Sequence, residues 1–495
     1  MANIITVKKG DTEIKKYSPI YWVHIAVTLF LMFGFGFIPP FAELTPVGMR
    51  VLGIFLGVVY GYTTCEIVWP SFFAFLAYGT SGFVDMNTAI ASMMGHPVVF
   101  QSLASFICVG SLTYYGFGKW FVRKTLSLKI FNGRPFFYTW CFMVVFGLSA
   151  IVVNQIALAI LLFPVWTDIA DNCGYSKDSS FRYVGFGGIL LGTTLGNALV
   201  PYTSWMLGLS QTWTQVTGSP INFGMMGSMT IPATVLIMTV YIFATKAIFK
   251  VDYSRMQAFD VNKMDESSKY LSRRTKRILV ITMFTTFMVI LANTLLGTEF
   301  SNFVLNVVTV GGAYCICAAI LLVLPSGEKD GKPCIEFNAV KETAISWPVI
   351  LMCAVTLPIA SAVTNEATGI VPWLTDVFTP VFAGRSGIFI LIFTIVLSIF
   401  LTNVGSNIAF GAAMIPIVAP FVVQSGMDPQ FAGAALIYII NIGVVLPGAS
   451  APAAISHARE ELPNGGKRVR VMLVGVLSVL VIAIPLFSVF AIIFG

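Results

Sequence analysis

The chain has 495 residues, of which 57% are hydrophobic and only 10% are charged. Soluble domains carry about 25% charged residues, so this composition excludes a water-soluble globule, a disordered chain and a disulfide-stapled secreted scaffold. The mean hydropathy of +0.86 indicates one polytopic membrane protein. The net charge of +7 is therefore no sign of a nucleic-acid partner.

Stretches of about 20 apolar residues, the length that crosses the hydrocarbon core as a helix, recur along the chain. Eleven are expected to span the membrane: 20–38, 46–63, 66–82, 97–116, 181–212, 222–248, 277–297, 302–324, 346–363, 429–460 and 469–494. Two longer stretches, 136–170 and 386–424, have polar residues near their middles. We expect these two to be re-entrant hairpins, which enter and leave by the same face. The predicted fold class is an all-α polytopic membrane protein with about 11 transmembrane helices plus two hairpins.

The basic residues predict the orientation. With the N-terminus in the cytoplasm, 27 of the 29 Lys and Arg residues fall in six segments predicted inside: 1–18, 119–134, 177–182, 246–277, 329–341 and 459–470. Only Arg50 and Arg385 fall outside. This asymmetry follows the positive-inside rule. It predicts a multi-pass protein of the cell membrane with a cytoplasmic N-terminus and with Gly495 outside.

The two halves of the chain contain a similar pattern of residues. Four pairs of landmarks share nearly one spacing: Pro97 and Pro348, Asn154 and Asn407, Pro164 and Pro416, and Pro201 and Pro452, which are 251, 253, 252 and 251 residues apart. Each half holds five spans and one hairpin, and an odd count makes the second copy an inverted-topology repeat.

The predicted organisation is a cytoplasmic N-terminus (1–18), a first repeat with an extra leading helix (19–249), a cytoplasmic linker (250–276) and a second, inverted repeat (277–495). The mixed segments 117–134 and 364–385 are expected to lie in the interface plane.

The membrane interior offers neutral polar groups and almost no charge. Residues 183–245 and 386–427 contain no Asp, Glu, Lys or Arg, and the eight cysteines form no CxxC pair. Polar residues instead stand at four helix interruptions: Asn154-Gln155, Gly196 to Ser204, Thr402 to Asn407, and Leu446 to Pro452. Non-helical backbone survives at membrane depth only beside protein or a watery cavity. Helix N-termini suit an anion and unwound carbonyls suit sodium, so the four interruptions are expected to converge on a binding site.

Each of these features has an ordinary alternative. A Pro-Gly break in one helix is commonly a kink, and Asn or Ser in a span commonly bonds a neighbouring helix. The pairing of all four interruptions favours a functional site. Two glycine series are expected only to allow close helix packing: Gly188, Gly192 and Gly196, and Gly53, Gly57 and Gly61.

This pattern resembles the divalent anion/sodium symporter family, within the larger ion transporter superfamily. The segment from Ser406-Asn407-Ile408 to Pro416 is similar to the family's Ser-Asn-Thr signature, and Leu446 to Ile455 is similar to its proline-containing loop in the tenth span. The topological likeness covers nearly the whole chain. It implies an elevator carrier in which the hairpins and the broken spans move against a scaffold, usually within a homodimer.

The resemblance also implies the roles of the residues. One sodium site would be lined by the first tip and the loop near Pro201, and its mirror site by the second tip and the loop near Pro452, with the anion between the tips. The residues assigned to the substrate are Asn154, Gln155, Pro201, Thr203, Asn403, Ser406, Asn407 and Pro452. The residues assigned to sodium are Asn154, Asn197, Thr402, Asn407 and Ser450.

The tips depart from the family signature. Val153-Asn154-Gln155 stands where Ser-Asn-Thr is expected, and Ile408 stands where a Thr is expected. The loss of hydroxyls suggests an anion that differs from the usual dicarboxylates or carries less charge, with Gln155 and Asn403 as substitute donors.

The predicted function is therefore transport of a small organic anion, sodium-coupled or exchanging, with sodium as coupling ion and no organic cofactor. One alternative is a proton-coupled or exchanging antiporter of the same superfamily. Another is an integral-membrane lipid enzyme, although three dispersed histidines offer little catalytic material. A channel would not explain inverted halves with hairpins.

Overall fold

The computed structural model shows an all-helical membrane-type architecture with one short β-ribbon. It describes residues 4–9, 12–126, 134–151, 155–201, 204–258, 270–295, 297–345, 347–363, 365–382, 384–404, 407–446, 449–457, 459 and 461–494. The all-α polytopic fold class is confirmed. The inverted orientation of the repeats and the re-entrant course of the hairpins stay predictions.

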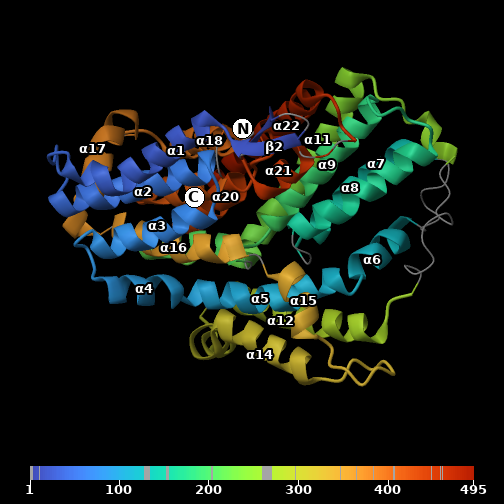
Figure 1. The fold of residues 1–495 in the computed structure, drawn as a ribbon, viewed down its shortest axis with the longest axis horizontal. Coiled ribbons are helices and arrows are strands. Elements are labelled where there is room, and N and C mark those ends of the chain that lie inside the picture. The colour runs from blue at the N-terminus through green and yellow to red at the C-terminus, as the bar shows by residue number, and fades with distance from the viewer. Residues whose placement is uncertain are drawn as a thin grey trace.

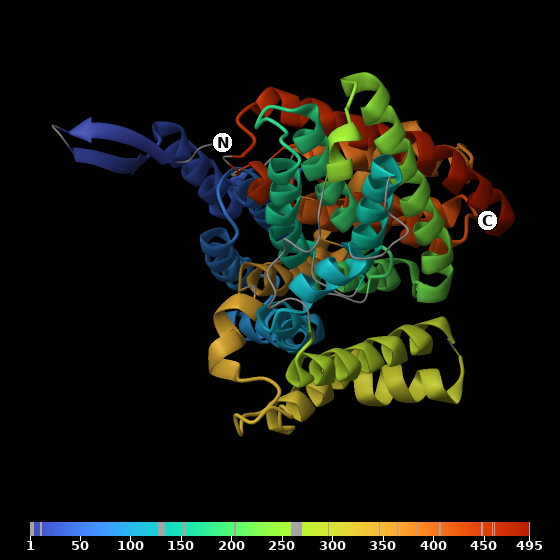
Figure 2. The same ribbon diagram turned by 90° about the vertical axis from the view of Figure 1, so that its right-hand side faces the viewer.

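The ribbon at the N-terminus was not expected from the polar segment 1–18. Strands β1 (Ile4–Lys9) and β2 (Thr12–Tyr17) pair antiparallel, with Ile4 opposite Tyr17. Figure 2 shows the ribbon extending away from the helical body.

Helices of the first half begin where the sequence provides caps and prolines. The side chains of Ser18, Thr45 and Asp85 each accept a hydrogen bond from a main-chain N–H in the first turn that follows. The elements are α1 (Pro19–Leu29), the π-helix η1 (Phe30–Gly34), the 3₁₀-helix η2 (Phe35–Phe37), α2 (Pro46–Thr64), α3 (Val68–Thr80), α4 (Met86–Met94), α5 (Pro97–Tyr114), α6 (Phe117–Leu126), α7 (Pro135–Ser149), α8 (Gln155–Asn172), α9 (Ser180–Asn197), α10 (Ser204–Thr217) and α11 (Phe223–Phe249).

The second half follows a short 3₁₀-helix, η4 (Ser254–Ala258). Its elements are α12 (Arg273–Thr294), α13 (Glu299–Asn302), the π-helix η7 (Phe303–Val308), α14 (Thr309–Val323), α15 (Phe337–Ala344), α16 (Trp347–Val363), the 3₁₀-helix η8 (Glu366–Thr368), α17 (Ile370–Phe382), α18 (Gly387–Val404), α19 (Asn407–Gln424), α20 (Pro429–Ile440), α21 (Ala451–His457) and α22 (Gly465–Phe494). The short helices α4 and α15 were not expected. The mixed segments 117–134 and 364–385 contain α6 and α17.

Seven helical stretches among the described residues are long and apolar enough to cross a membrane: Pro19–Phe37, Met86–Tyr114, Phe223–Phe249, Arg273–Ala292, Glu299–Val323, Gly387–Val404 and Gly465–Ile493. Shorter apolar helices accompany them, including α7. With 15 residues, α7 rises about 22 Å, less than the roughly 30 Å of hydrocarbon. Such a length is typical of a helix that enters the membrane without crossing it.

Corresponding helices of the two halves pack in corresponding ways. α9 packs against α7, α8 and α11, while α20 packs against α18, α19 and α22. The halves meet where α11 packs on α22, α10 on α19, and α21 on α8. Helices α5, α12, α14 and α15 lie together at one edge of the molecule (Figures 1 and 2). The hairpins and broken spans therefore share one central region.

Candidate functional site

The predicted interruptions fall at the ends of helices in this central region. α8 begins at Gln155 and α19 begins at Asn407, each after a predicted hairpin tip. α9 ends at Asn197 and α20 ends at Ile440, each before a segment that is not helical. Three residues assigned to the site lie outside the described residues: Asn154, Thr203 and Ser406.

Asn407 fastens the second hairpin to the segment that leaves α20. Its main-chain N–H donates to the carbonyl oxygen of Ala449 at 2.9 Å, and its Nδ2 donates to the carbonyl oxygen of Asn441 at 3.3 Å. Asn407 is only 2% exposed. The first residue of α19 is thus held by both ends of one non-helical segment.

Asn403, in the last turn of α18, uses its whole amide group on the same segment and on its own helix. Its Nδ2 donates to the carbonyl oxygens of Ile442 at 2.6 Å and Ile399 at 2.9 Å. Its Oδ1 accepts from the main-chain N–H groups of Val444 at 2.8 Å and Val445 at 3.0 Å. The amide of Asn403 therefore holds this segment in place. Its predicted role as a substrate donor stays a prediction.

Main-chain oxygens crowd around Gly443. A Cβ atom there would lie 2.8 Å from the carbonyl oxygen of Ala449 and 2.9 Å from that of Thr402. The hydroxyl of Ser450 donates to the carbonyl oxygen of Gly443 at 2.6 Å and accepts a hydrogen bond from the first turn of α21. Thr402 and Ser450 therefore lie in the same cluster as Asn407, as the predicted second sodium site requires.

The first half places its predicted residues at equivalent helix ends. Asn197 is buried and its Nδ2 donates to Sδ of Met206 on α10, at 3.5 Å. Gln155 is also buried, and its Oε1 has no hydrogen-bond partner among the described residues. Pro201 and Pro452 are both buried. The structure thus brings each predicted residue that it describes to an interruption, although Gln155 is left with an unused acceptor.

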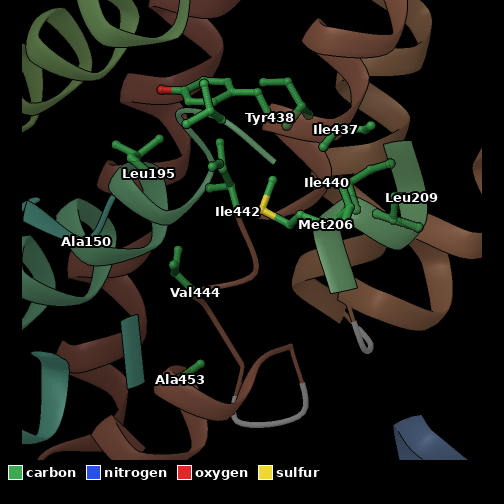
Figure 3. Packing of buried hydrophobic residues seen from close by; sticks show 14 of the residues in the cluster. Ala150, Leu195, Met206, Leu209, Ile437, Tyr438, Ile440, Ile442, Val444 and Ala453 are labelled. Atoms are coloured by element: carbon green, nitrogen blue, oxygen red, sulfur yellow. The ribbon is translucent and has the colours of Figure 1, made fainter. Parts of the chain in front are cut away.

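Asn441 joins the two halves, and the sequence analysis did not single it out. Its Nδ2 donates to the carbonyl oxygen of Thr194, in the last turn of α9. In Figure 3, Ile442 follows on the segment that leaves α20, with Leu195 of α9 on one side and Met206 of α10 on the other. Apolar side chains therefore pack on both sides of the segment that leaves α20.

The helix ends give the region a mixed electrostatic character without charged side chains. α8 and α19 begin here, and helix N-termini carry partial positive charge and unpaired N–H groups. α9 and α20 end here, and helix C-termini carry partial negative charge and unpaired carbonyls. A helix N-terminus of this kind suits an anion, and a helix C-terminus suits a cation.

Comparisons with known proteins show the family and the fold of the chain. The model of the citrate transporter family, CitMHS, matches residues 62–443. A curated relative is the sodium-dependent dicarboxylate transporter SdcS of Staphylococcus saprophyticus, which is 22% identical over 393 residues, covering 74% of this chain and 71% of that protein.

Two solved structures share the fold. The YdaH transporter of Alcanivorax borkumensis aligns with a TM-score of 0.55 and 13% identity, over 81% of this chain and 86% of that chain. MtrF of Neisseria gonorrhoeae, described as illuminating a class of antimetabolite efflux pumps, aligns with a TM-score of 0.54 and 15% identity, over 83% of this chain and 87% of that chain. The chain belongs to the citrate transporter family and is a multi-pass membrane transporter. This confirms the expected kinship with the divalent anion/sodium symporters and the ion transporter superfamily.

Proposed function

We propose that this member of the citrate transporter family moves a small carboxylate-type anion across the cell membrane, coupled to sodium. The observation that supports the proposal is that the end of α20, the last turn of α9 and the start of α19 are joined by hydrogen bonds of Asn441 and Asn407, two uncharged and buried residues. The central segments 183–245 and 386–427 have no cationic side chain, so bound sodium has to offset the charge of the anion. Coupling follows because the anion then binds far better when sodium is present.

The anion would lie between the N-termini of α8 and α19. The proposed donors are main-chain N–H groups in the first turns of these helices and the amides of Gln155 and Asn407, with Asn154 and Ser406 predicted at the tips. Amide and main-chain donors orient a carboxylate without a fixed countercharge. The buried Pro201 and Pro452 mark where the broken spans border the anion.

The sodium ions would lie toward the unwound segments. One site would use Asn154 and Asn197, and the other would use Thr402, Asn407 and Ser450 with nearby main-chain carbonyls. Sodium is a hard cation, and oxygen ligands of this kind suit it. The sodium dependence in the name of the dicarboxylate transporter SdcS is consistent with this proposal.

The inverted repeat and an elevator motion belong to the same proposal. The first hairpin's helices begin at Pro135 and Gln155, and the second hairpin's begin at Gly387 and Asn407, so both pairs are 252 residues apart. Gln155, rather than Asn154, is then the counterpart of Asn407. The matched packing of α9 and α20 supports two equivalent units. We propose that the hairpins and broken spans move as one body, within a homodimer.

The alternatives make different demands on the same region. Proton coupling needs a titratable group in the transport path, and the two central segments contain no carboxylate. An exchanging antiporter would need no sodium gradient. Membership of a transporter family argues against a lipid enzyme.

Transport by purified protein in proteoliposomes tests the proposal. We expect an inward sodium gradient to stimulate uptake of labelled citrate or succinate, and a choline gradient of equal strength to have no such effect. Asn407→Ala should abolish the stimulation, because it removes both a tip donor and a predicted sodium ligand. Asn306→Ala, at an exposed asparagine in η7, serves as the control.

The outcome separates the alternatives. Uptake that is independent of sodium and driven by a pH gradient would show that the coupling ion is the proton. Uptake that requires only a counter-anion inside the vesicles would establish exchange. Uptake by Asn407→Ala that matches the parent would show that the site is misplaced, provided that both proteins have the same melting temperature.

A further inference from the structure

One buried acceptor at the centre of the molecule is unused by the protein. Asn441 is the first residue after α20 and is completely buried. Its Nδ2 is used on Thr194, and its main-chain oxygen accepts from Nδ2 of Asn407 and from the N–H of Gly443 at 2.9 Å. Its side-chain Oδ1 has no hydrogen-bond partner among the described residues.

Such an oxygen is unfavourable unless a ligand uses it. Leaving a buried acceptor without a hydrogen-bond partner destabilises the folded protein. The bond to Thr194 fixes which end of the amide carries the N–H groups, so the unused atom is the oxygen. An amide oxygen only accepts, and it therefore attracts a cation or a hydrogen-bond donor and repels a carboxylate.

The surroundings favour a cation. The bond from Asn441 to Thr194 brings the end of α20 against the last turn of α9. Two helix C-termini therefore lie close together, and the partial negative charge of helix C-termini favours a cation near them. The nearby crowding of the carbonyl oxygens of Thr402 and Ala449 around Gly443 adds to this.

The two broken helices also end alike. α9 ends on the buried Asn197, which the sequence analysis assigned to sodium, and α20 ends immediately before the buried Asn441. Each broken span therefore presents an asparagine amide at its interruption. This likeness assigns to Asn441 the role expected of Asn197.

We propose that Oδ1 of Asn441 is a ligand of the coupling sodium ion, held between the ends of α9 and α20; this rests on the proposed sodium-coupled function. Asn441 also accepts from Asn407 of α19 and donates to α9, so an ion at Asn441 orders elements of both halves. Binding of sodium in the two halves is then cooperative through this residue.

Three variants test the proposal in the purified full-length protein. The melting temperature is measured against NaCl concentration, with choline chloride keeping the ionic strength constant. Asn441→Ala removes the oxygen, Asn441→Asp keeps it and adds charge, and Asn306→Ala is the exposed control. We expect Asn441→Ala to raise the half-saturating sodium concentration at least tenfold and to lower the Hill coefficient.

Asn441→Asp should instead keep the parent's half-saturating concentration or lower it at pH 8, where the carboxylate is charged. Its sodium response should weaken as the pH falls, because protons then compete for the carboxylate, and the parent should show no such trend. This second variant keeps the test valid if Asn441→Ala does not fold.

The possible failures are distinct. If sodium changes neither the melting temperature nor the transport rate of the parent protein, both the proposed sodium coupling and the assignment of Asn441 as a sodium ligand are wrong. A responsive parent and a folded Asn441→Ala with an unchanged sodium response overturn only the assignment of Asn441. An unchanged sodium response with a raised KM for hydroxylated anions would make Asn441 a substrate ligand instead, and would also overturn it.

Discussion

Three buried amide side chains in the central region differ in how far the protein itself uses them. Asn403 uses both amide N–H groups and its amide oxygen in hydrogen bonds to main-chain groups. Asn441 uses only its amide nitrogen. Oε1 of Gln155 has no hydrogen-bond partner among the described residues. A side chain whose hydrogen bonds are all satisfied internally positions backbone, whereas one with a buried unused atom is available to a ligand. This difference predicts that Asn403 acts mainly by positioning backbone and that Asn441 and Gln155 are available to a ligand.

Removing the amide of Asn403 should destabilise the protein before it changes selectivity. Asn403→Ala leaves the N–H groups of Val444 and Val445 and the carbonyl oxygen of Ile442 without their buried partner. At about 1–3 kcal/mol for each unsatisfied group, we expect a loss of several degrees in melting temperature. The relative uptake of different anions should stay that of the parent.

Thermal unfolding in detergent and competition uptake measure the two effects. Asn403→Asp, which keeps the acceptor for Val444 and Val445, should lose less stability than Asn403→Ala. If Asn403→Ala melts like the parent and transports a different set of anions, Asn403 contacts the substrate after all.

At this scale the sequence predicted which residues gather but not what each one does. Asn403 and Asn407 were found because they stand beside an expected hairpin tip, and both lie in the central cluster. The role of Asn403 depends on how the segment after α20 folds back, which no local pattern shows. Asn441 was missed because it is one polar residue in an apolar run, placed before the Pro-Gly pair that marked the break.

At the scale of helices, glycines bring the first hairpin against the first broken span. A Cβ atom on Gly196 of α9 would lie 1.7 Å from the carbonyl oxygen of Gly147 on α7, and one on Gly188 would lie 2.2 Å from Sδ of Met143. Gly192 is also tight, with the carbonyl oxygen of Met143 at 3.1 Å. The expectation that this series serves close helix packing is confirmed.

Gly196→Ala should therefore separate α7 from α9. Backbone has to move to admit the methyl group, since the obstructing atom is a main-chain oxygen, and overpacking of this kind typically costs about 1–3 kcal/mol. We expect a lower melting temperature and a large loss of transport, because the end of α9 carries Asn197. Gly227→Ala is the matched control, because its nearest neighbour would be 3.8 Å away.

The comparison of the two glycine variants is decisive within one assay. Similar melting temperatures and uptake for both would mean that α7 and α9 do not pack as closely as described. A large effect of Gly227→Ala would mean that any added methyl group in these helices is harmful.

Helix boundaries were predictable where proline or a polar tip interrupts an apolar run. The expected break in 181–212 is present at the end of α9, whereas in 429–460 the helix α20 already ends at Ile440, before the interruption expected at Leu446 to Pro452. The short helix α4 was missed because its nine residues are far fewer than the roughly 20 apolar residues by which membrane-spanning helices were sought. Asp85 is nevertheless a clear N-cap signal for it. The β-ribbon has no such signal, because its lysines stand in adjacent pairs, Lys8-Lys9 and Lys15-Lys16, which breaks the alternation of apolar and polar residues.

At the scale of the whole molecule, basic segments that are distant in the chain meet. Tyr175 donates to the carbonyl oxygen of Asp252 at 2.7 Å, and Arg255 donates to that of Gly174 at 3.0 Å, which joins the turn after α8 to the start of the linker. Lys467, in the first turn of α22, also pairs with Asp178 in that turn, at 3.7 Å. Three segments predicted to lie inside, 177–182, 246–277 and 459–470, are thus gathered at one place. The predicted orientation requires these three segments to lie on the same side of the membrane. The orientation itself stays a prediction.

The orientation can be tested with two cysteine substitutions. Lys177 and Arg385 are both exposed, and they lie in segments predicted to face the cytoplasm and the outside, respectively. We expect a membrane-impermeant maleimide to label Arg385→Cys in intact cells, and to label Lys177→Cys only after lysis or in inverted vesicles. The parent, with its eight cysteines, gives the background for each preparation.

The same experiment examines the second hairpin. Arg385 comes two residues before α18, and α19 ends at Gln424, so a re-entrant hairpin has both ends on one side. A third variant, Ser425→Cys, should then label from the same side as Arg385→Cys. Labelling of the two from opposite sides would make 386–424 a full crossing, which would reverse every later span and place the basic segment 459–470 outside, against the positive-inside rule.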